Sequence, residues 1–302
     1  MFAAFDVNFD NDFKALWKTK RSKYQNAYLE KTFDMREQIQ SKITNAIKGN
    51  KIDGNTVQNT WFPKVKNMDV FLSHSHEDIA DVRAFAGWLQ EMLGLNVFID
   101  TDLWGDIKKL EKKLRPLLNK ELSISDNKRI YDYDNSRKMF QHTNTMLSVA
   151  LQQMIDESEA LFFLNTDKSI KVHEENLMNA TYSPWIYSEV ACSRIIRRKP
   201  LICYRDETKY YKNQKTKSKL CESLNEEYIL FSVVYQLDLE HMIKLNKSDF
   251  SSIIFEDSPR KIGKPCNLDT LYKKKYKKGW NEFENHLLLK INQINSLRNV
   301  YK

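Results

Sequence analysis

The sequence MDVFLS at residues 68–73 is a short apolar run that ends in a polar residue, a pattern typical of a buried β-strand. Apolar residues then recur at helical spacing from Ile79 to Leu93, and Gly94 is a suitable helix stop. A second apolar run, LNVFID, follows at residues 95–100. This order of strand, helix and strand predicts a βαβ unit with two parallel strands.

The same alternation continues further along the chain. Helical spacing marks residues 147–154, and the apolar run ALFFLN at residues 160–165 predicts a third strand. A helix is expected over residues 184–197, followed by a strand, PLICY, at residues 200–204. We therefore predict an α/β fold of the flavodoxin-like, doubly wound type, with a mainly parallel sheet.

The remaining segments are expected to surround this core, residues 68–204, within an α/β domain that spans residues 63–302. Residues 1–62 are predicted to form an N-terminal helical extension, because four apolar residues recur every four positions: Met35, Ile39, Ile43 and Ile47. Residues from about 101 to 141 form an insertion with a basic helix at 107–114. The C-terminal part, 205–302, is expected to close with an amphipathic helix.

Composition narrows the class of protein. The 302 residues are 41% hydrophobic, and no apolar run approaches the roughly 18 to 20 residues of a membrane-spanning helix. We expect a cytoplasmic protein with no membrane partner. The four cysteines lack the spacing of a structural metal site. A net charge of +8 favours anionic ligands such as nucleotides, nucleic acids or acidic proteins.

Polar side chains follow the predicted strands. Ser73 and His74 come at the end of the first, Asp100 at the end of the second, and the segment 181–189 opens the helix beyond the third. In an open parallel sheet, ligands bind outside the carboxyl ends of the strands. Loops are also polar simply because they are wet, so each segment alone favours function and solvation about equally.

Glu189 is the most informative of these residues. Ser183 and Pro184 form a good N-cap and first-turn pair, which fixes the helix start. Glu189 then shares an apolar stripe with Trp185 and Cys192, with no Lys or Arg three or four residues away. A buried carboxylate is costly unless it is paired or hydrogen-bonded. Glu189 is therefore either satisfied by a distant arginine or retained for function.

A single carboxylate limits the reaction that such a site can perform. Ordinary glycoside hydrolysis requires a general acid beside a nucleophile or base. Nicotinamide is already a cationic pyridinium in NAD, so it departs neutral without an added proton. One carboxylate that orients the ribose and stabilises an oxocarbenium charge suffices. NAD would be the substrate, with no cofactor.

Together, residues 69–78 (DVFLSHSHED), 97–100 (VFID), 185–189 (WIYSE) and 201–204 (LICY) resemble the Toll/interleukin-receptor (TIR) domain family. The similarity is greatest to bacterial TIR-like proteins of anti-phage defence, of the Thoeris type. In catalytic members this resemblance implies cleavage of NAD to nicotinamide and ADP-ribose, or a cyclic or conjugated ADP-ribose signal. It also implies self-association and a downstream effector that senses the product.

The resemblance assigns roles to residues of this chain. Glu189 corresponds to the catalytic glutamate, and Ser73 and His74 lie near the nicotinamide and its ribose. The loop that begins at Asp100 gates the site and mediates self-association, with Trp104 as a candidate wall, although a long basic insertion follows it here. Further candidates for substrate contact stand before or at the start of helices: His142, Tyr182, Ser183 and Trp185.

Three other interpretations remain open. A non-catalytic TIR module would assemble through its loops and recruit partners. The lysine-rich segment 272–279 would suit phosphates or single-stranded nucleic acid, but a solvated loop is the simpler interpretation. His74 and His76 form a possible metal pair, yet the spacing supplies no third ligand, so no metal is expected.

Overall fold

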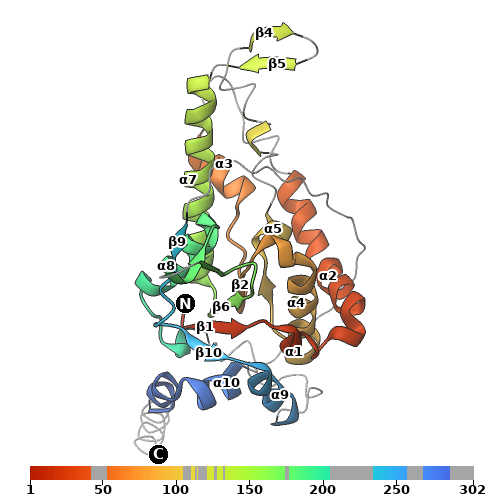
Figure 1. The fold of residues 1–302 in the computed structure, drawn as a ribbon, viewed down its shortest axis with the longest axis vertical. Coiled ribbons are helices and arrows are strands. Elements are labelled where there is room, and N and C mark those ends of the chain that lie inside the picture. The colour runs from red at the N-terminus through yellow and green to blue at the C-terminus, as the bar shows by residue number, and fades with distance from the viewer. Residues whose placement is uncertain are drawn as a thin grey trace, which may run out of the picture.

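The computed structural model describes residues 1–41, 53–104, 110–112, 114, 121–125, 128–131, 133–173, 177–204, 234–256 and 268–285. Its centre is a five-stranded sheet in which all neighbouring strands are parallel (Figure 1). The strand order is β10 (Ile243–Leu245), β1 (Ala3–Asn8), β6 (Ala160–Asn165), β2 (Val70–Ser73) and β3 (Val97–Phe98). The predicted α/β fold with a parallel sheet is confirmed.

The three strands predicted from the quoted sequence form one half of this sheet. Counted from β2, the order β3-β2-β6 is 2-1-3, which is the order of a flavodoxin-like sheet. Helix α4 (Ile79–Leu93) connects β2 to β3 and ends at Gly94, whose φ of 66° is left-handed and favours glycine. The chain then returns past β2 to reach β6.

Strand β1 corrects the prediction of an entirely helical N-terminal segment. It lies between β6 and β10, and all of its residues except Asn8 are buried. A strand buried on both faces has no alternating pattern, so a short apolar run such as AAFDV carries little signal. The segments that follow are helical: α1 (Asn11–Lys14), η1 (Lys18–Lys20), α2 (Arg21–Ser41) and α3 (Gly54–Trp61).

The predicted strand at residues 200–204 is wrong. Residues Leu201–Tyr204 form a 3-10 turn, η4, after Pro200. The position beside β6 is already filled by β1, so this apolar segment instead contributes Leu201 to the hydrophobic core that also contains Phe85 and Phe250. The helix predicted from Met35, Ile39, Ile43 and Ile47 lies in part within α2, which already begins at Arg21; residues 42–52 lie outside the described part.

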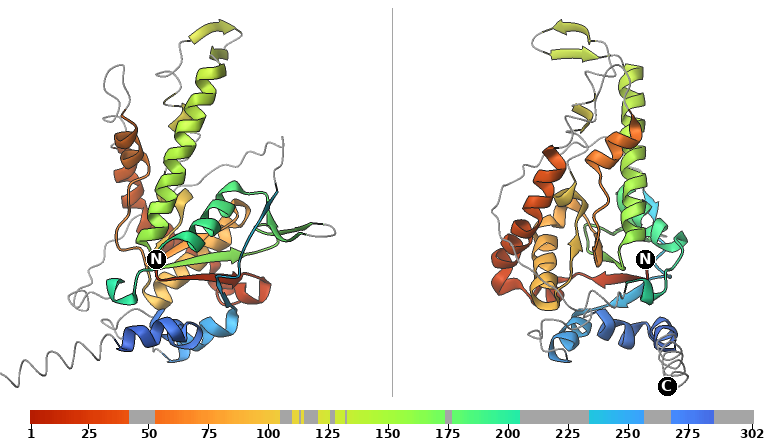
Figure 2. Two further views of the ribbon diagram at one scale, coloured as in Figure 1. Left: turned by 90° about the vertical axis from the view of Figure 1, so that its left-hand side faces the viewer. Right: turned by 180° about the vertical axis from the view of Figure 1, so that it is seen from behind.

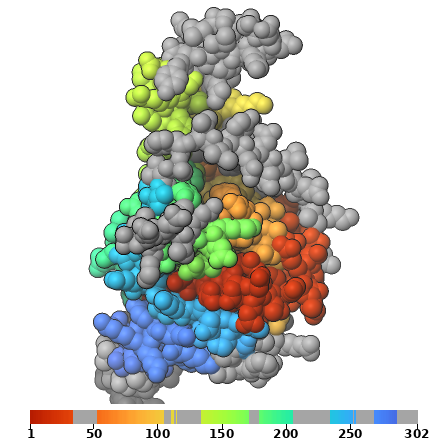
Figure 3. Space-filling view, in the orientation of Figure 1, coloured from red at the N-terminus to blue at the C-terminus, as the bar shows by residue number. Residues whose placement is uncertain are grey.

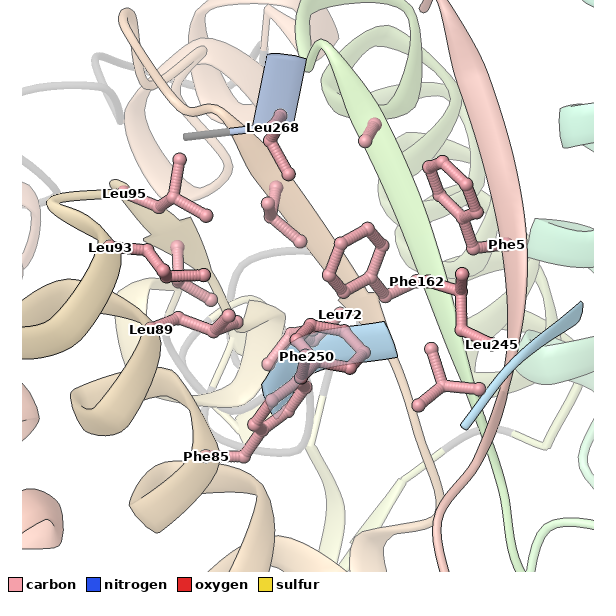
Figure 4. Close-up of a cluster of buried hydrophobic side chains, with 14 of the residues drawn as sticks. Phe5, Leu72, Phe85, Leu89, Leu93, Leu95, Phe162, Leu245, Phe250 and Leu268 are labelled. Atoms are coloured by element: carbon pink, nitrogen blue, oxygen red, sulfur yellow. The ribbon is translucent and has the colours of Figure 1, made fainter. Parts of the chain in front are cut away.

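One face of the sheet is covered by α2, α4, α9 (Lys247–Glu256) and α10 (Leu268–Lys275). Their core is rich in aromatic rings, and Figure 4 shows how Phe85 of α4 and Phe250 of α9 approach Leu72 and Phe162 of the sheet. The C-terminal part lies directly against the N-terminal segment on the face shown in Figure 3, as the pairing of β10 with β1 requires.

The opposite face carries α3, α7 (Tyr133–Glu157) and α8 (Pro184–Ile195). A small antiparallel sheet lies beside α8, with β7 (Lys171–His173), β8 (Leu177–Thr181) and β9 (Tyr235–Gln236). Helix α7 extends beyond the central sheet. It follows the hairpin of β4 (Glu121–Ser125) and β5 (Lys128–Tyr131), which stands away from the body in both views of Figure 2.

The remaining predicted helices are described only in part. Residues 110–112 and 114 of the predicted basic helix are helical, and residues 277–285 include Trp280 and Phe283 of the predicted closing helix, both buried. The lysine-rich segment begins within α10, where Tyr272 is fully buried, so the solvated loop expected at its start is wrong. Among the described helices, none is both long and apolar enough to cross a membrane.

Candidate functional site

Helix α8 places Glu189 toward the sheet. The Ser183 hydroxyl accepts a hydrogen bond from the backbone N–H of Ile186 at 3.2 Å, and Pro184 occupies the first turn, as the sequence predicts. Glu189 is consequently on the buried side of the helix with Ile186 and Val190, and its side chain is only 5% exposed. The predicted burial of this carboxyl is confirmed.

The surroundings of Glu189 favour its protonated form. Burial raises the pKa of the carboxyl well above its usual value of 4.5, and the nearby negative charge of Asp100 raises it further. The Ser73 hydroxyl faces the carboxyl and opposes this shift in pKa, without a hydrogen bond of regular geometry. Within the described residues, no Lys or Arg forms an ion pair with Glu189. The carboxyl is thus desolvated, and among the described residues only the Ser73 hydroxyl opposes the rise in its pKa.

The end of β2 adds polar atoms that lack partners. Ser73 is fully buried, and its Oγ has no hydrogen bond in the described structure. The Nδ1 atom of His74 lies 3.0 Å from the carbonyl oxygen of Leu72, to which it donates if it carries the ring proton. Burial lowers the pKa of His74, which favours this neutral ring and leaves the buried Nε2 as an unused acceptor.

The start of α5 (Asp100–Leu103) lies beside this strand end. Asp100 is close enough to influence the pKa of both Glu189 and His74, and the Oγ1 atom of Thr101 is buried with no partner. Buried polar atoms without hydrogen bonds are rare in folded proteins. Three such atoms occur at this edge of the sheet, on Ser73, His74 and Thr101. The sequence analysis predicted Ser73 and His74 as site residues but not Thr101.

The described part of the loop after β3 ends at Trp104. Trp104 is almost fully buried: its indole N–H donates to the carbonyl oxygen of Pro63 at 3.0 Å, and its ring packs edge-on against Phe62 and Phe98. Trp104 thus belongs to the hydrophobic core between the sheet and the helices that cover this face. The sequence could not show this, because its partners Phe62 and Pro63 are some 41 positions away.

The other predicted contacts divide into two groups. Tyr182, Ser183 and Trp185 stand around the start of α8 and are partly exposed, one to two turns before Glu189. His142 is exposed inside α7, which begins at Tyr133, so it does not stand before the helix as predicted. No contact joins His142 to the Glu189 site within the described residues.

A polar network that the sequence did not reveal supports the site. The Thr166 hydroxyl, just after β6, donates to Asp78 Oδ2 at 2.7 Å, and Lys168 Nζ lies 3.3 Å from Asp78 Oδ1. Lys168 also donates to the carbonyl oxygen of Glu77 at 3.0 Å. These bonds fix the short helix η3 (His76–Asp78), which follows Ser73 and His74, against the loop after β6. The carboxyl ends of β2 and β6 are therefore held together.

The described residues include no cluster of three His, Cys, Asp or Glu side chains that would hold a metal ion. The rings of His74 and His76 lie 5.8 Å apart between centroids, but His76 is exposed while His74 is buried. No protein-family model matches this chain, and neither a curated protein nor a solved structure is significantly similar to it.

Proposed function

We propose that this protein cleaves NAD at the bond between nicotinamide and ribose. The observation that carries the proposal is the Glu189 carboxyl. It is buried, has no ion pair within the described residues, and lies near Ser73 at the end of β2 and Asp100 at the start of α5. In the protein alone, burial and the nearby charge of Asp100 favour the protonated form of Glu189. A cationic ligand group bound beside Glu189 and Asp100 would lower the pKa of Glu189 and stabilise its carboxylate, because opposite charges attract strongly in surroundings of low polarity.

NAD supplies such a group in its pyridinium ring. As the glycosidic bond breaks, the ring takes the bonding electrons and leaves as neutral nicotinamide, while positive charge develops on the ribose. The carboxylate of Glu189 would stabilise this oxocarbenium charge, and Asp100 would add to the stabilisation. Ser73 would donate its hydroxyl to Glu189 or to the ribose. His74 Nε2 would accept a hydrogen bond from a ribose hydroxyl or from the carboxamide.

This chemistry agrees with the TIR-like resemblance of the sequence, and we extend the proposal accordingly. The protein would act in the cytoplasm, in bacterial anti-phage defence, as a self-associating enzyme that depletes NAD or releases an ADP-ribose signal for a downstream effector. Water, a nitrogen of the same molecule or another nucleophile would complete the reaction, which gives hydrolysis, cyclisation or conjugation.

The test is chromatography with mass detection of NAD after incubation with concentrated protein, with and without lysate of phage-infected cells. Wild type should release nicotinamide, and Glu189→Gln should reduce the rate at least 100-fold, since it removes the charge but keeps the shape. Glu91→Gln is the matched control, because Glu91 forms only a surface pair with Lys23. Equal release by wild type and Glu189→Gln would refute the assignment.

The same experiment addresses the competing function. A non-catalytic TIR-like module would assemble, as measured by light scattering, without consuming NAD in either condition. Nicotinamide release would exclude that alternative, and the mass of the second product would distinguish ADP-ribose from a cyclic or conjugated form.

A further inference from the structure

A second buried carboxyl lies on the same face of the central sheet as the Glu189 site. Asp6 of β1 is only 8% exposed. Its even-numbered neighbour Ala4 belongs to the core beneath α7 and α8, whereas Phe5 and Val7 belong to the opposite core. Because side chains alternate along a strand, Asp6 is directed to the face that α8 covers.

The register of the sheet relates Asp6 to Ser73. Asp6 pairs with Phe163 of β6, and Phe163 pairs with Ser73 of β2, so the three residues form one row across adjacent strands. Two strand spacings amount to about 10 Å. Asp6 is therefore about 10 Å from Ser73. In the strand order, β1 lies on one side of β2 and β3 on the other, so Asp6 and Asp100 are on opposite sides of Ser73.

The hydrogen bonding of Asp6 is incomplete. Its Oδ1 accepts a hydrogen bond from the side-chain amide of Asn165 at 3.0 Å, while Oδ2 has no partner within the described residues. Lys244 is the neighbour of Asp6 on β10 and is exposed, but it forms no ion pair with Asp6 in this part of the chain. Burial raises the pKa of Asp6, although the hydrogen bond from Asn165 and the positive charge of Lys244 both oppose this shift.

Asn165 completes a pair of acceptors at the edge of the sheet. It is the last residue of β6 and is only partly buried, and its side-chain carbonyl forms no hydrogen bond within the described residues. The loop that follows it is fixed through Thr166 and Asp78. Asp6 Oδ2 and the Asn165 side-chain oxygen are thus two further acceptors on a hydrogen-bonded pair of side chains, which suits a ligand that brings two donors.

We propose that Asp6 and Asn165 bind a ribose diol, the two adjacent hydroxyls of a nucleotide sugar. This inference rests on the proposed function: a dinucleotide has two riboses separated by a pyrophosphate. If one ribose lies at Glu189 and Ser73, the second ribose would reach Asp6, which lies two strands away in the same row of paired residues. A carboxylate that accepts from ribose hydroxyls is a recurring device at the carboxyl ends of parallel strands.

The test uses two ligands that differ only in the diol: adenosine monophosphate and its 2′,3′-dideoxy form. Binding is followed by ligand-observed NMR with wild type, Asp6→Asn, Asn165→Ala and the control Asp12→Asn, an exposed residue paired with Lys247. We expect Asp6→Asn and Asn165→Ala to weaken binding of adenosine monophosphate about tenfold or more, as for a lost hydrogen bond to a charged group. The dideoxy ligand should bind wild type as weakly as adenosine monophosphate binds the variants. Its affinity should be unchanged by either substitution.

Several results would overturn this inference. Wild type that does not distinguish the two ligands has no diol site, whether or not the variants fold. Equal weakening of both ligands by Asp6→Asn would indicate a purely structural role. Because these titrations need no turnover, they are independent of nicotinamide release: failure to cleave NAD refutes the proposed function alone. If both proposals hold, Asp6→Asn should raise the KM for NAD and leave kcat within about twofold.

Discussion

At the scale of single residues, the Glu189 carboxyl links function to stability. The folded state desolvates this group and places it near Asp100, and both effects disfavour the charged form. A free carboxyl in the unfolded chain has no such constraint. Its ionisation therefore opposes folding at neutral pH, which is a cost that a purely structural residue would have no reason to carry.

Replacement of Glu189 by Gln should stabilise the protein at neutral and alkaline pH. Because the folded-state pKa is raised above the usual 4.5, the folded state holds its proton more tightly, and stability is lost as pH rises from 4.5 through the folded-state pKa. Each pKa unit corresponds to about 1.4 kcal/mol. Glu189→Gln removes this loss, so its advantage in Tm should be largest near pH 8 and should vanish near pH 4.5.

Calorimetric scans between pH 4.5 and 8 measure this dependence, with Glu91→Gln as control. Glu91 lies in a surface ion pair, so its substitution should cost at most about 1 kcal/mol and bring no gain. A Glu189→Gln variant that is less stable than wild type at pH 8 would show that the carboxylate has a compensating partner.

Residues near one another in the sequence were predictable, and residues joined by the fold were not. Ser183 and Pro184 fix the start of α8, and with it the face of the helix on which Glu189 lies. Ser73 ends an apolar run. Local sequence patterns were therefore sufficient to predict both residues. The burial of Trp104 depends on Pro63. Asp6 was not a candidate at all, because its neighbours Asn165 and Phe163 are brought to it only by strand pairing.

At the scale of elements, the contact between α2 and α4 shows why a glycine occupies the middle of a helix. A Cβ atom built on Gly87 would lie 1.9 Å from the backbone carbonyl oxygen of Tyr24. Backbone atoms of α2 cannot move aside as a flexible side chain would. Gly87 therefore permits α2 to lie against α4 and to bury Tyr24 and Tyr28 beside Trp88.

Gly87→Ala should accordingly separate the two helices and destabilise the protein by about 1–3 kcal/mol, or more if α2 detaches. Gly94→Ala is an informative comparison, because an added Cβ there meets no atom within 4 Å and only the φ of 66° opposes it. That cost is about 1–2 kcal/mol of backbone strain. Urea unfolding measures both, and hydrogen exchange should show increased exchange in α2 for Gly87→Ala only. Unchanged exchange in α2 would contradict the close contact.

Elements with a helical period were easier to predict than buried strands. Apolar spacing and Gly94 defined α4 correctly. The apolar runs at 3–8 and 200–204 look alike, yet the first is a central strand and the second is a 3-10 turn. Only one of the two segments can pair with β6 on the side away from β2, and residues 3–8 occupy that position. A local sequence pattern carries no information about such long-range strand pairing.

At the scale of the whole molecule, the first residues of the chain are part of its centre. β1 pairs with β6 on one side and with β10 on the other, so it joins the strands that the candidate site uses to the C-terminal part. The aromatic residues after it are almost completely buried in the same core: Phe9, Phe13 and Trp17. The sequence-based boundary at residue 63 therefore does not mark a removable extension in this structure.

A chain that begins at residue 63 should fail to fold. It would lose β1 and several large side chains, each of which contributes about 1.5–3 kcal/mol through burial, against a typical total stability of about 5–15 kcal/mol. Replacement of the hairpin residues 121–131 by a short Gly-Ser linker is the contrasting change, since the hairpin stands away from the sheet (Figures 1 and 2). It should leave Tm within a few degrees. Near-ultraviolet circular dichroism and calorimetry measure both changes. A cooperative thermal transition for residues 63–302 alone would contradict the first prediction. It would show that the sheet is stable without β1, because a sheet that depends on β1 cannot melt cooperatively once this strand is removed.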